Sequence, residues 1–420
     1  MIRLSKYDKS VLNGEHGPGA LTAMKIITRM AEVYGTDRLM DIDAAHIDSS
    51  LYMGDATLEF AEHLASQGAQ VVVPSTLNVS GVDEHGWQAW SVPPDWADNA
   101  RRQMVAYVAM GCVQTWTCAP YQTEHRPHFG QQIAWGESNA IAFANSVIGA
   151  RTERYPDLLD ICAAITGRVP AVGYHLEENR RGQIHMPLEG THRKLQENDG
   201  LYPVLGHLVG KVAQDKVPVL TGFDVSPTED QLKAFGAAAA SSGTVGLFHI
   251  VGITPEAPTI PAAFHGREPE RVVEITMKSL RAARAELSTA EGEKLDMVAL
   301  GCPHFSQPEF EHLAGLLEGK EKASQVEFLV TSNRAMTMLA EKTGSLETLK
   351  KFGGRITRDT CILTTPMLPD EIRIIMTNSA KYAYYAPGML NTQVVFGTLE
   401  DCVRSAIDGR VNRDEGLWKT

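Results

Sequence analysis

The chain has 420 residues, of which 43% are hydrophobic and 21% are charged, a composition that excludes disordered and fibrous proteins. This length exceeds the usual size of one hydrophobic core, so two or three packed domains are expected. The net charge is −12 and no basic stripe is present, so nucleic acid is not an expected partner. The N-terminus is polar and no long apolar stretch follows, so we expect a cytoplasmic protein that does not bind membranes.

Helix and strand patterns alternate along the first third of the chain. A helix is predicted to begin near Pro18, because proline is favoured in the first turn of a helix and apolar residues follow at helical spacing. A buried strand is predicted over residues 39–42, an amphipathic helix over 57–66, and a second buried strand over 71–73. This alternation is typical of a parallel sheet covered by helices.

The same alternation returns in the second half of the chain and continues to its end. The sequence predicts helices over 228–240, 268–287, 309–317 and 334–342, and strands over 245–251, 295–300 and 326–330. No short repeat, low-complexity tract or long linker marks a boundary. We place the boundaries near residues 150 and 290, which gives three α/β domains over residues 1–150, 151–290 and 291–420.

Polar and reactive side chains follow several predicted strands. In open parallel sheets, ligands bind beyond the carboxyl ends of the strands, and three such loops cover residues 43–48, 301–304 and 331–333. His46 is the strongest independent candidate for proton transfer, since it is predicted to follow a strand and lies near Asp48, a carboxylate able to fix its tautomer. His249 differs, because it lies within an apolar predicted strand, where a core role is equally compatible.

The six cysteines argue against a disulfide scaffold in a reducing compartment. Cys162 and Cys402 occupy packed helical positions, where cysteine behaves as a small hydrophobic residue. Three others lie in turns, from which a thiolate can reach a metal: Cys118, Cys302 and Cys361. No tight CxxC pair is present, so spacing alone leaves open whether these three are unrelated or meet at one metal centre.

Longer motifs make the chain resemble the aconitase X family, a branch of the aconitase superfamily, over nearly its whole length. The matching segments are AHID (45–48), TCAPY (117–121), GESNA (136–140), ANSVIGART (144–152), HLEENR (175–180), FHIVGITPEA (248–257), LGCPH (300–304), DTC (359–361) and NSAKY (378–382). The resemblance implies several α/β/α domains with mostly parallel sheets around a central cleft. It also implies an iron–sulfur cluster, of undetermined nuclearity, on Cys118, Cys302 and Cys361.

The family also has a small swivel domain, which is fused to the large part in some members and separate in others. The resemblance therefore implies a small swivel-domain subunit as the partner of this chain. Removing water from a hydroxy acid requires a base for the proton beside the carboxylate and a Lewis acid for the hydroxide, a role that iron with an open coordination position fills. In the wider superfamily a base comes from the swivel domain.

Candidate site residues follow from this chemistry and from the motifs. The candidates for proton transfer are His46, Glu137, His304 and Lys381. The candidates for binding the substrate are Tyr52, Ser80, Asn145, Arg151, Arg180 and Ser379, with Arg181 as a further arginine. A surface salt bridge for each arginine, and a structural role for each proton-transfer candidate, remain open alternatives.

Two dehydrations are associated with the family: that of cis-3-hydroxy-L-proline to Δ1-pyrroline-2-carboxylate and that of mevalonate 5-phosphate. The acidic chain and the lack of a glycine-rich phosphate loop favour the cationic imino acid. Two other hypotheses are a zinc hydrolase built on His46 and Asp48, and a non-catalytic regulatory or iron-sensing protein with the same fold. The sequence thus predicts an iron–sulfur hydro-lyase that acts on a small hydroxy acid.

Overall fold

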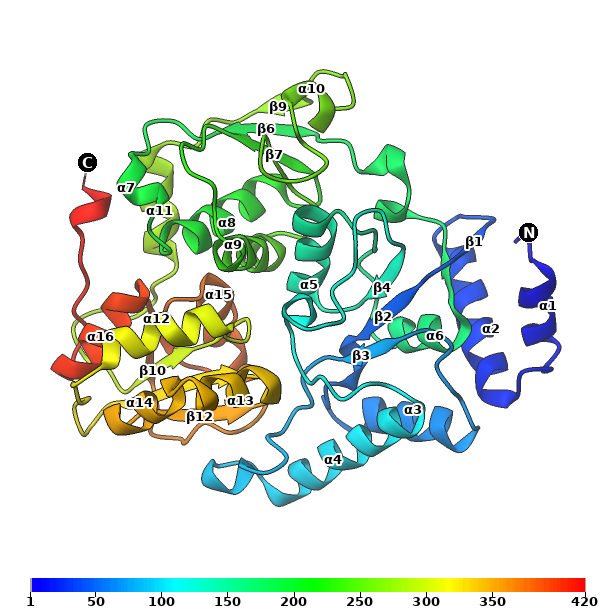
Figure 1. The fold of residues 1–420 in the computed structure, drawn as a ribbon, viewed down its shortest axis with the longest axis horizontal. Helices are drawn as coiled ribbons and strands as arrows, with labels where there is room; N and C mark the ends of the chain where they lie inside the picture. Colours follow the sequence, from blue (N-terminus) through cyan, green and yellow to red (C-terminus); the bar gives the residue numbers. More distant parts are fainter. Residues whose placement is uncertain (1, 420) are drawn as a thin grey trace.

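The computed structural model describes residues 2–419 and arranges them in three lobes, each built around its own parallel sheet (Figure 1). The N-terminal lobe (blue to cyan) lies to the right in Figure 1, the middle lobe (green) at the top and the C-terminal lobe (yellow to red) at the lower left. The predicted α/β class with mostly parallel sheets is confirmed.

The N-terminal lobe contains three parallel strands in the order β3-β2-β4, which are β3 (Ser75–Leu77), β2 (Ala44–Ile47) and β4 (Ile133–Trp135). A separate antiparallel pair joins β1 (Leu39–Asp41) to β5 (Arg168–Pro170). The helices of this lobe are α1 (Lys6–Leu12), α2 (Pro18–Val33), α3 (Asp55–Ser66), α4 (Pro94–Ala109), α5 (Ser138–Phe143) and α6 (Leu159–Thr166). Strands β3 and β4 are buried throughout, as expected for a parallel sheet covered on both faces.

The middle lobe contains a four-stranded parallel sheet in the order β8-β7-β6-β9. Its strands are β6 (Ile184–Pro187), β7 (Pro218–Thr221), β8 (His249–Ile250) and β9 (Arg271–Val272). Its helices are α7 (Arg193–Gln196), α8 (Leu201–Ala213), α9 (Glu229–Ser242), α10 (Ile260–Ala263) and α11 (Met277–Glu286). Helices α8 and α9 pack closely because Gly206 and Gly210 face α9, where an added Cβ would lie 2.2 Å from Phe235 O and from Ser242 Oγ, respectively.

The C-terminal lobe contains a five-stranded, fully parallel sheet in the order β12-β11-β10-β13-β14. Its strands are β10 (Met297–Leu300), β11 (Glu327–Ser332), β12 (Arg355–Arg358), β13 (Ile374–Thr377) and β14 (Gln393–Phe396), and its helices are α12 (Gln307–Leu317), α13 (Arg334–Lys342), α14 (Ser345–Phe352), α15 (Ala380–Met389) and α16 (Leu399–Asp408). Alternate residues of β10 enter different cores: Met297 joins the large core shared with the other lobes, and Val298 joins a core under α12, α14 and α16.

Most predicted elements are confirmed, but the strand predicted over 71–73 is wrong, because strand β3 begins only at Ser75. The amide of Val71 donates to Met110 O, and that of Val72 donates to Ala164 O, so these amides bond to two different segments and form no ladder. Val72 is also 58% exposed.

Three further element predictions need correction. Residues 268–275 are not helical; their amides partly pair with β6, and the helix begins at Met277, where Thr276 forms a capping box with Ser279. The strand predicted over 39–42 is half-exposed rather than buried. The strand predicted over 245–251 is reduced to His249–Ile250.

None of the helices within residues 2–419 is both long enough and apolar enough to cross a lipid bilayer.

Candidate active site

A cavity of about 430 Å³ lies where the carboxyl ends of two parallel sheets meet. The three-stranded sheet supplies Asp48 after β2, Asn78 after β3 and Glu137 after β4. The five-stranded sheet supplies Cys302 and His304 after β10, Cys361 after β12 and Lys381 after β13. The loop after α4 adds Cys118. The structure thus brings together the three predicted metal ligands and three of the four predicted proton-transfer residues.

Backbone geometry fixes each cysteine at the cavity. The segment before Cys118 runs along β3, where the amide of Thr117 donates to Leu77 O at 3.2 Å. Gly301 precedes Cys302 with a φ of +92°, and a Cβ added there would lie 2.1 Å from Thr331 O, so only glycine fits. Asp359, two residues before Cys361, has a φ of +62°, and its carboxylate accepts hydrogen bonds at 2.7 Å from both the backbone amide and Nε of Arg334.

The donor set fits an iron–sulfur cluster. All three cysteines are free thiols. Burial raises the pKa of the Cys302 thiol to about 12 and that of Cys118 further still, while the Lys381 ammonium opposes both shifts. Within residues 2–419 no three Cys, His, Asp or Glu side chains are arranged to hold a single metal ion. Three thiols around one cavity instead suit a cluster, because its several irons distribute the thiolates over different metal atoms.

His304 connects the loops of all three cysteines. It lies two residues after Cys302, its backbone amide donates to Cys118 Sγ at 3.2 Å, and its Nε2 lies 2.9 Å from the carbonyl oxygen of Thr360, next to Cys361. Burial lowers the pKa of His304 to about 4, so the ring is neutral and Nε2 carries the proton that it donates. Its buried Nδ1 has no hydrogen-bond partner.

Glu137 and Lys381 form a buried ion pair in the cavity wall, with 2.5 Å between Oε1 and Nζ. Burial alone would raise the pKa of Glu137, but Lys381 and the amide of Ala140 lower it below its usual value. Burial alone would lower the pKa of Lys381, but Glu137, Cys302 and Cys118 raise it well above its usual value. Lys381 is therefore a permanent ammonium beside the thiols.

The structure places His46 outside the cavity wall. His46 belongs to strand β2 rather than to a loop, and its Nδ1 lies 2.7 Å from the hydroxyl of Thr76, so no carboxylate fixes its tautomer. Burial lowers its pKa to about 4. A zinc site on His46 and Asp48 finds no third protein ligand within residues 2–419.

None of the predicted substrate-binding residues lines the cavity. Tyr52 accepts a hydrogen bond from Asn99, Ser80 donates to the carbonyl groups of Val82 and Asp359, and Ser379 caps α15 and hydrogen-bonds the Cys302 thiol. Ser80 and Ser379 thus support the loops of Cys361 and Cys302 rather than lining the cavity.

The arginines are used in ion pairs elsewhere in the molecule. Arg180 is 1% exposed and donates to Glu256 and Asn145, and Asn145 in turn bonds to backbone groups of Thr152 and Gly246. Arg151 pairs with Glu177, and Arg181 pairs with Glu270. Among the residues that line the cavity, none is an arginine.

Asp48, Asn78 and Asp157 also line the cavity. The sequence predicted Asp48 only as a partner of His46 or a zinc ligand, predicted only backbone amides near Asn78 as helpers for the substrate carboxylate, and predicted no role for Asp157. Asp48 is the first residue after β2 and Asn78 the first after β3. The position of these polar residues at strand ends is the signal in the sequence that points to the cavity. Asp157 lies in a loop without a comparable signal.

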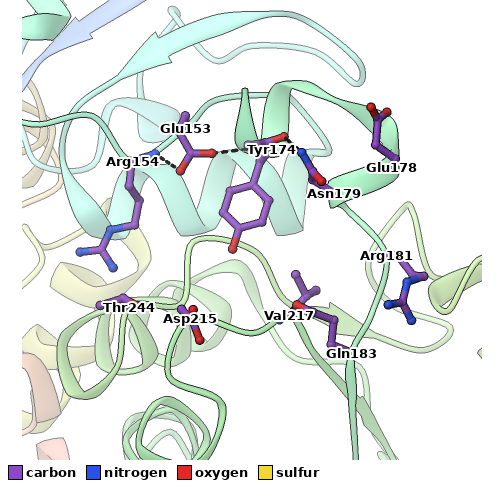
Figure 2. Close-up of a pocket in the computed structure, with 11 residues that line it drawn as sticks. Glu153, Arg154, Tyr174, Glu178, Asn179, Arg181, Gln183, Asp215, Val217 and Thr244 are labelled. Carbon is purple, nitrogen blue, oxygen red and sulfur yellow. Dashed lines mark hydrogen bonds between the residues drawn. The ribbon is translucent and has the colours of Figure 1, made fainter. Parts of the chain in front are cut away.

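A second, larger hollow of about 600 Å³ lies between the N-terminal and middle lobes (Figure 2). In Figure 2 its Glu153 carboxylate accepts hydrogen bonds from the amides of Arg154 and Tyr174, both at 2.8 Å. Its lining contains no cysteine or histidine. The reactive groups gather instead in the smaller cavity between the two sheets.

Comparison with known proteins agrees with this geometry. Sequence models of the first, second and third domains of aconitase X match residues 1–178, 182–285 and 295–408. The chain is 45% identical over 419 residues to the cis-3-hydroxy-L-proline dehydratase of Pseudomonas aeruginosa, with coverage of 99% of this chain and 72% of that protein. It is 44% identical to the dehydratase of the same name from Hypocrea jecorina, with coverage of 97% and 69%.

More distant relatives agree as well. The phosphomevalonate dehydratase large subunit of Methanothermobacter thermautotrophicus is 35% identical, with coverage of 96% of this chain and 98% of that protein. The crystal structure of Thermococcus kodakaraensis aconitase X in its holo-form aligns with a TM-score of 0.86 at 31% identity, covering 96% of this chain and all of that chain. The resemblance drawn from the motifs is confirmed: the chain belongs to the aconitase X family.

Proposed function

We propose that this chain is the large, catalytic part of an iron–sulfur hydro-lyase that converts cis-3-hydroxy-L-proline to Δ1-pyrroline-2-carboxylate. The observation that carries the proposal is the excess of acidic side chains over cations in the cavity that also holds the thiols of Cys118, Cys302 and Cys361. Its one cation, Lys381, is already paired with Glu137, and the wall also carries two further acidic side chains, Asp48 and Asp157, which a bound cation would hold as carboxylates. Such a wall attracts a cationic imino acid and disfavours a phosphorylated anion. The dehydratases of that name are also the more similar relatives, at 45% and 44% identity.

Cys118, Cys302 and Cys361 would hold the cluster. When bound, the cluster supplies a Lewis acid with an open coordination position for the departing hydroxyl group. Lys381 uses two of its three N–H donors on Glu137 and Ser138, which leaves the third to bind the substrate carboxylate. The neutral ring of His304 presents an unpartnered Nδ1 that can accept a proton or a hydrogen bond.

A small swivel-domain subunit is part of the proposal. Lys381 is charged, Glu137 is held in an ion pair, and burial lowers the pKa of His304 to about 4 and makes it a weak base, so none of the three is well suited to remove the proton beside the substrate carboxylate. We therefore assign that base to the partner. Supporting this assignment, the chain covers 98% of a relative named as a large subunit.

The test is anaerobic co-expression with the small subunit, followed by iron and sulfide analysis and by assays of cis-3-hydroxy-L-proline and mevalonate 5-phosphate. Turnover of the imino acid with bound iron and sulfide supports the proposal. Turnover of mevalonate 5-phosphate would instead favour the second candidate, whose named relatives this chain covers almost completely. Bound cluster without turnover would favour an iron-sensing protein, and absence of iron would contradict the assignment of the cysteines.

A further inference from the structure

Asp48 is an acidic side chain of the cavity that forms no ion pair with any cation within residues 2–419. Among the ion pairs of residues 2–419, Glu137 has Lys381, whereas Asp48 and Asp157 have none. The carboxylate of Asp48 accepts a hydrogen bond from the side-chain amide of Asn78. A buried carboxylate without a counter-ion is costly, so a cationic group of a ligand would stabilise it.

The fold holds Asp48 in this position by close packing. A Cβ added at Gly136 would lie 2.6 Å from Asp48 Cβ and 2.8 Å from Asp160 Oδ2, so only glycine allows β4 to pass so close. Asp160 accepts hydrogen bonds from the amide of Ser49 at 3.0 Å and from its hydroxyl at 2.6 Å, which fixes the turn after Asp48.

Asn78 provides a second acceptor at the same place. Asn78 is 2% exposed and lines the cavity, and its Oδ1 is buried without a hydrogen-bond partner. A buried acceptor without a donor costs free energy, so its presence in a ligand cavity points to a donor on the ligand. Asp48 and Asn78 together offer a carboxylate and a carbonyl oxygen, which match the two N–H donors of a secondary ammonium.

The surrounding charges agree with this role. Burial is the main cause that raises the pKa of Asp48 to about 8, and the carboxylates of Glu137, Asp160 and Asp157 raise it further, against a partial opposing effect of Lys381. A cation bound beside Asp48 would relieve the repulsion among these groups and restore the charged carboxylate.

We propose that Asp48, together with Oδ1 of Asn78, binds the ring ammonium of the substrate and so selects cyclic imino acids over hydroxy acids that lack the nitrogen. This inference rests on the proposed function. The interaction is non-covalent, and Asp48 therefore determines specificity rather than taking part in the bond-breaking step.

The test compares two unreactive ligands of the holoenzyme with its small subunit. L-proline carries the ring nitrogen, whereas tetrahydrofuran-2-carboxylate has oxygen in its place, and calorimetry gives both dissociation constants. The wild type is expected to prefer proline, and Asp48→Asn is expected to reduce that preference by about ten- to a hundredfold, the range for a hydrogen bond to a charged group. Asp215→Asn, in the separate hollow of Figure 2, is the matched control and should leave the preference unchanged.

The outcomes separate this inference from the proposed function. If the wild type turns over cis-3-hydroxy-L-proline but Asp48→Asn keeps the full preference for proline, only the role of Asp48 is overturned. Equal weakening of both ligands would show a merely structural role and would also overturn it. If the wild type neither binds proline nor turns over the imino acid, both the inference and the proposed function fail.

A second measurement needs no variant. Burial and the neighbouring carboxylates raise the pKa of free Asp48 to about 8, so binding of proline near neutral pH, which favours the charged carboxylate, should release protons that binding of the oxygen analogue does not release. Calorimetry in two buffers with different ionisation enthalpies measures the number of protons released. Equal proton release for the two ligands would overturn the assignment.

Discussion

Replacing Lys381 by methionine would leave the carboxylate of Glu137 buried without its cation. The side chains of Glu137 and Lys381 are only 8% and 14% exposed, and removing one partner of such a pair costs about 3–5 kcal/mol. An unfolding entropy of about 2.1 cal/mol/K per residue amounts to roughly 0.9 kcal/mol/K for 420 residues. Lys381→Met is therefore expected to lower the unfolding midpoint by about 3–6 °C for a single transition of the whole chain.

Calorimetry on the metal-free protein would measure this shift for Lys381→Met, Glu137→Gln and the double variant. The double variant should recover much of the loss, because it no longer buries an unpaired charge. Lys351→Met is the matched control: its pair with Glu347 is largely exposed, so its midpoint should move by no more than about 1 °C. This role of the ion pair would be refuted if the losses from Lys381→Met and Glu137→Gln simply added in the double variant, or if Lys381→Met lowered the unfolding midpoint no more than Lys351→Met does.

Three further predictions concern the cysteines, a glycine and pH. Single serine substitutions of Cys118, Cys302 and Cys361 should abolish iron retention, while Cys162→Ser in buried helix α6 should keep it; iron in all three loop variants would contradict the ligand assignment. Gly301→Ala should destabilise the protein by about 1–3 kcal/mol through backbone strain and should lose iron, because its Cβ would meet Thr331 O. Gly315→Ala is the control: its Cβ has open space, so the variant should be neutral or slightly stabilising. Equal melting temperatures and equal iron content of the two variants would contradict the role of Gly301. The pKa of Asp48 is about 8 in the folded protein and its ordinary value is 3.8, so its stabilising effect is complete below about pH 4 and is lost progressively as pH rises to about 8. Asp48→Asn should therefore flatten the decline of the melting temperature between about pH 4 and 8 in metal-free protein, and an unchanged slope would contradict the raised pKa.

The elements that could be predicted from the sequence are those with local signals at their ends. Pro18 in the first turn marks helix α2, and helix α13 begins after Asn333, whose side chain accepts the amide of Met336 at 2.8 Å. The valines at 71–73 show why local signals are not enough. Their composition is typical of a strand, but their amides bond to segments near residues 110 and 164, and such partners depend on tertiary structure.

Site residues could be predicted from the sequence where they directly follow a strand, because the loop at the carboxyl end of a parallel strand faces the ligand site. Cys302 follows β10 and lines the cavity, as expected for a loop at a carboxyl end. Cys118 follows a helix; its place in a turn made it a candidate ligand, and only the family resemblance joined it to Cys302 and Cys361 at one site. His46 was misplaced because β2 extends through Ile47, which leaves His46 in the core opposite Thr76 and makes Asp48 the first residue beyond the strand. Arg180 could not be excluded by sequence, because its buried pairing with Glu256 joins residues far apart in the chain.

The middle lobe contributes no side chain to the cavity wall, yet it holds the central cysteine loop in place. Lys233 of α9 is 2% exposed, lies 2.8 Å from Asp230 and also pairs with Glu309 of α12. Its ammonium donates to the carbonyl oxygen of His304 at 3.4 Å.

At His304 the three lobes therefore meet: Cys118 comes from the N-terminal lobe, Cys302 and Cys361 come from the C-terminal lobe, and Lys233 comes from the middle lobe. Loops are ordinarily the most mobile parts of a fold, but the buried hydrogen bonds at His304 restrain the loops that they join. The separation of the three cysteines in sequence is thus explained physically, because the lobes must pack before the thiols can converge. Iron retention should accordingly report on the packing of all three lobes, including the one that supplies no ligand.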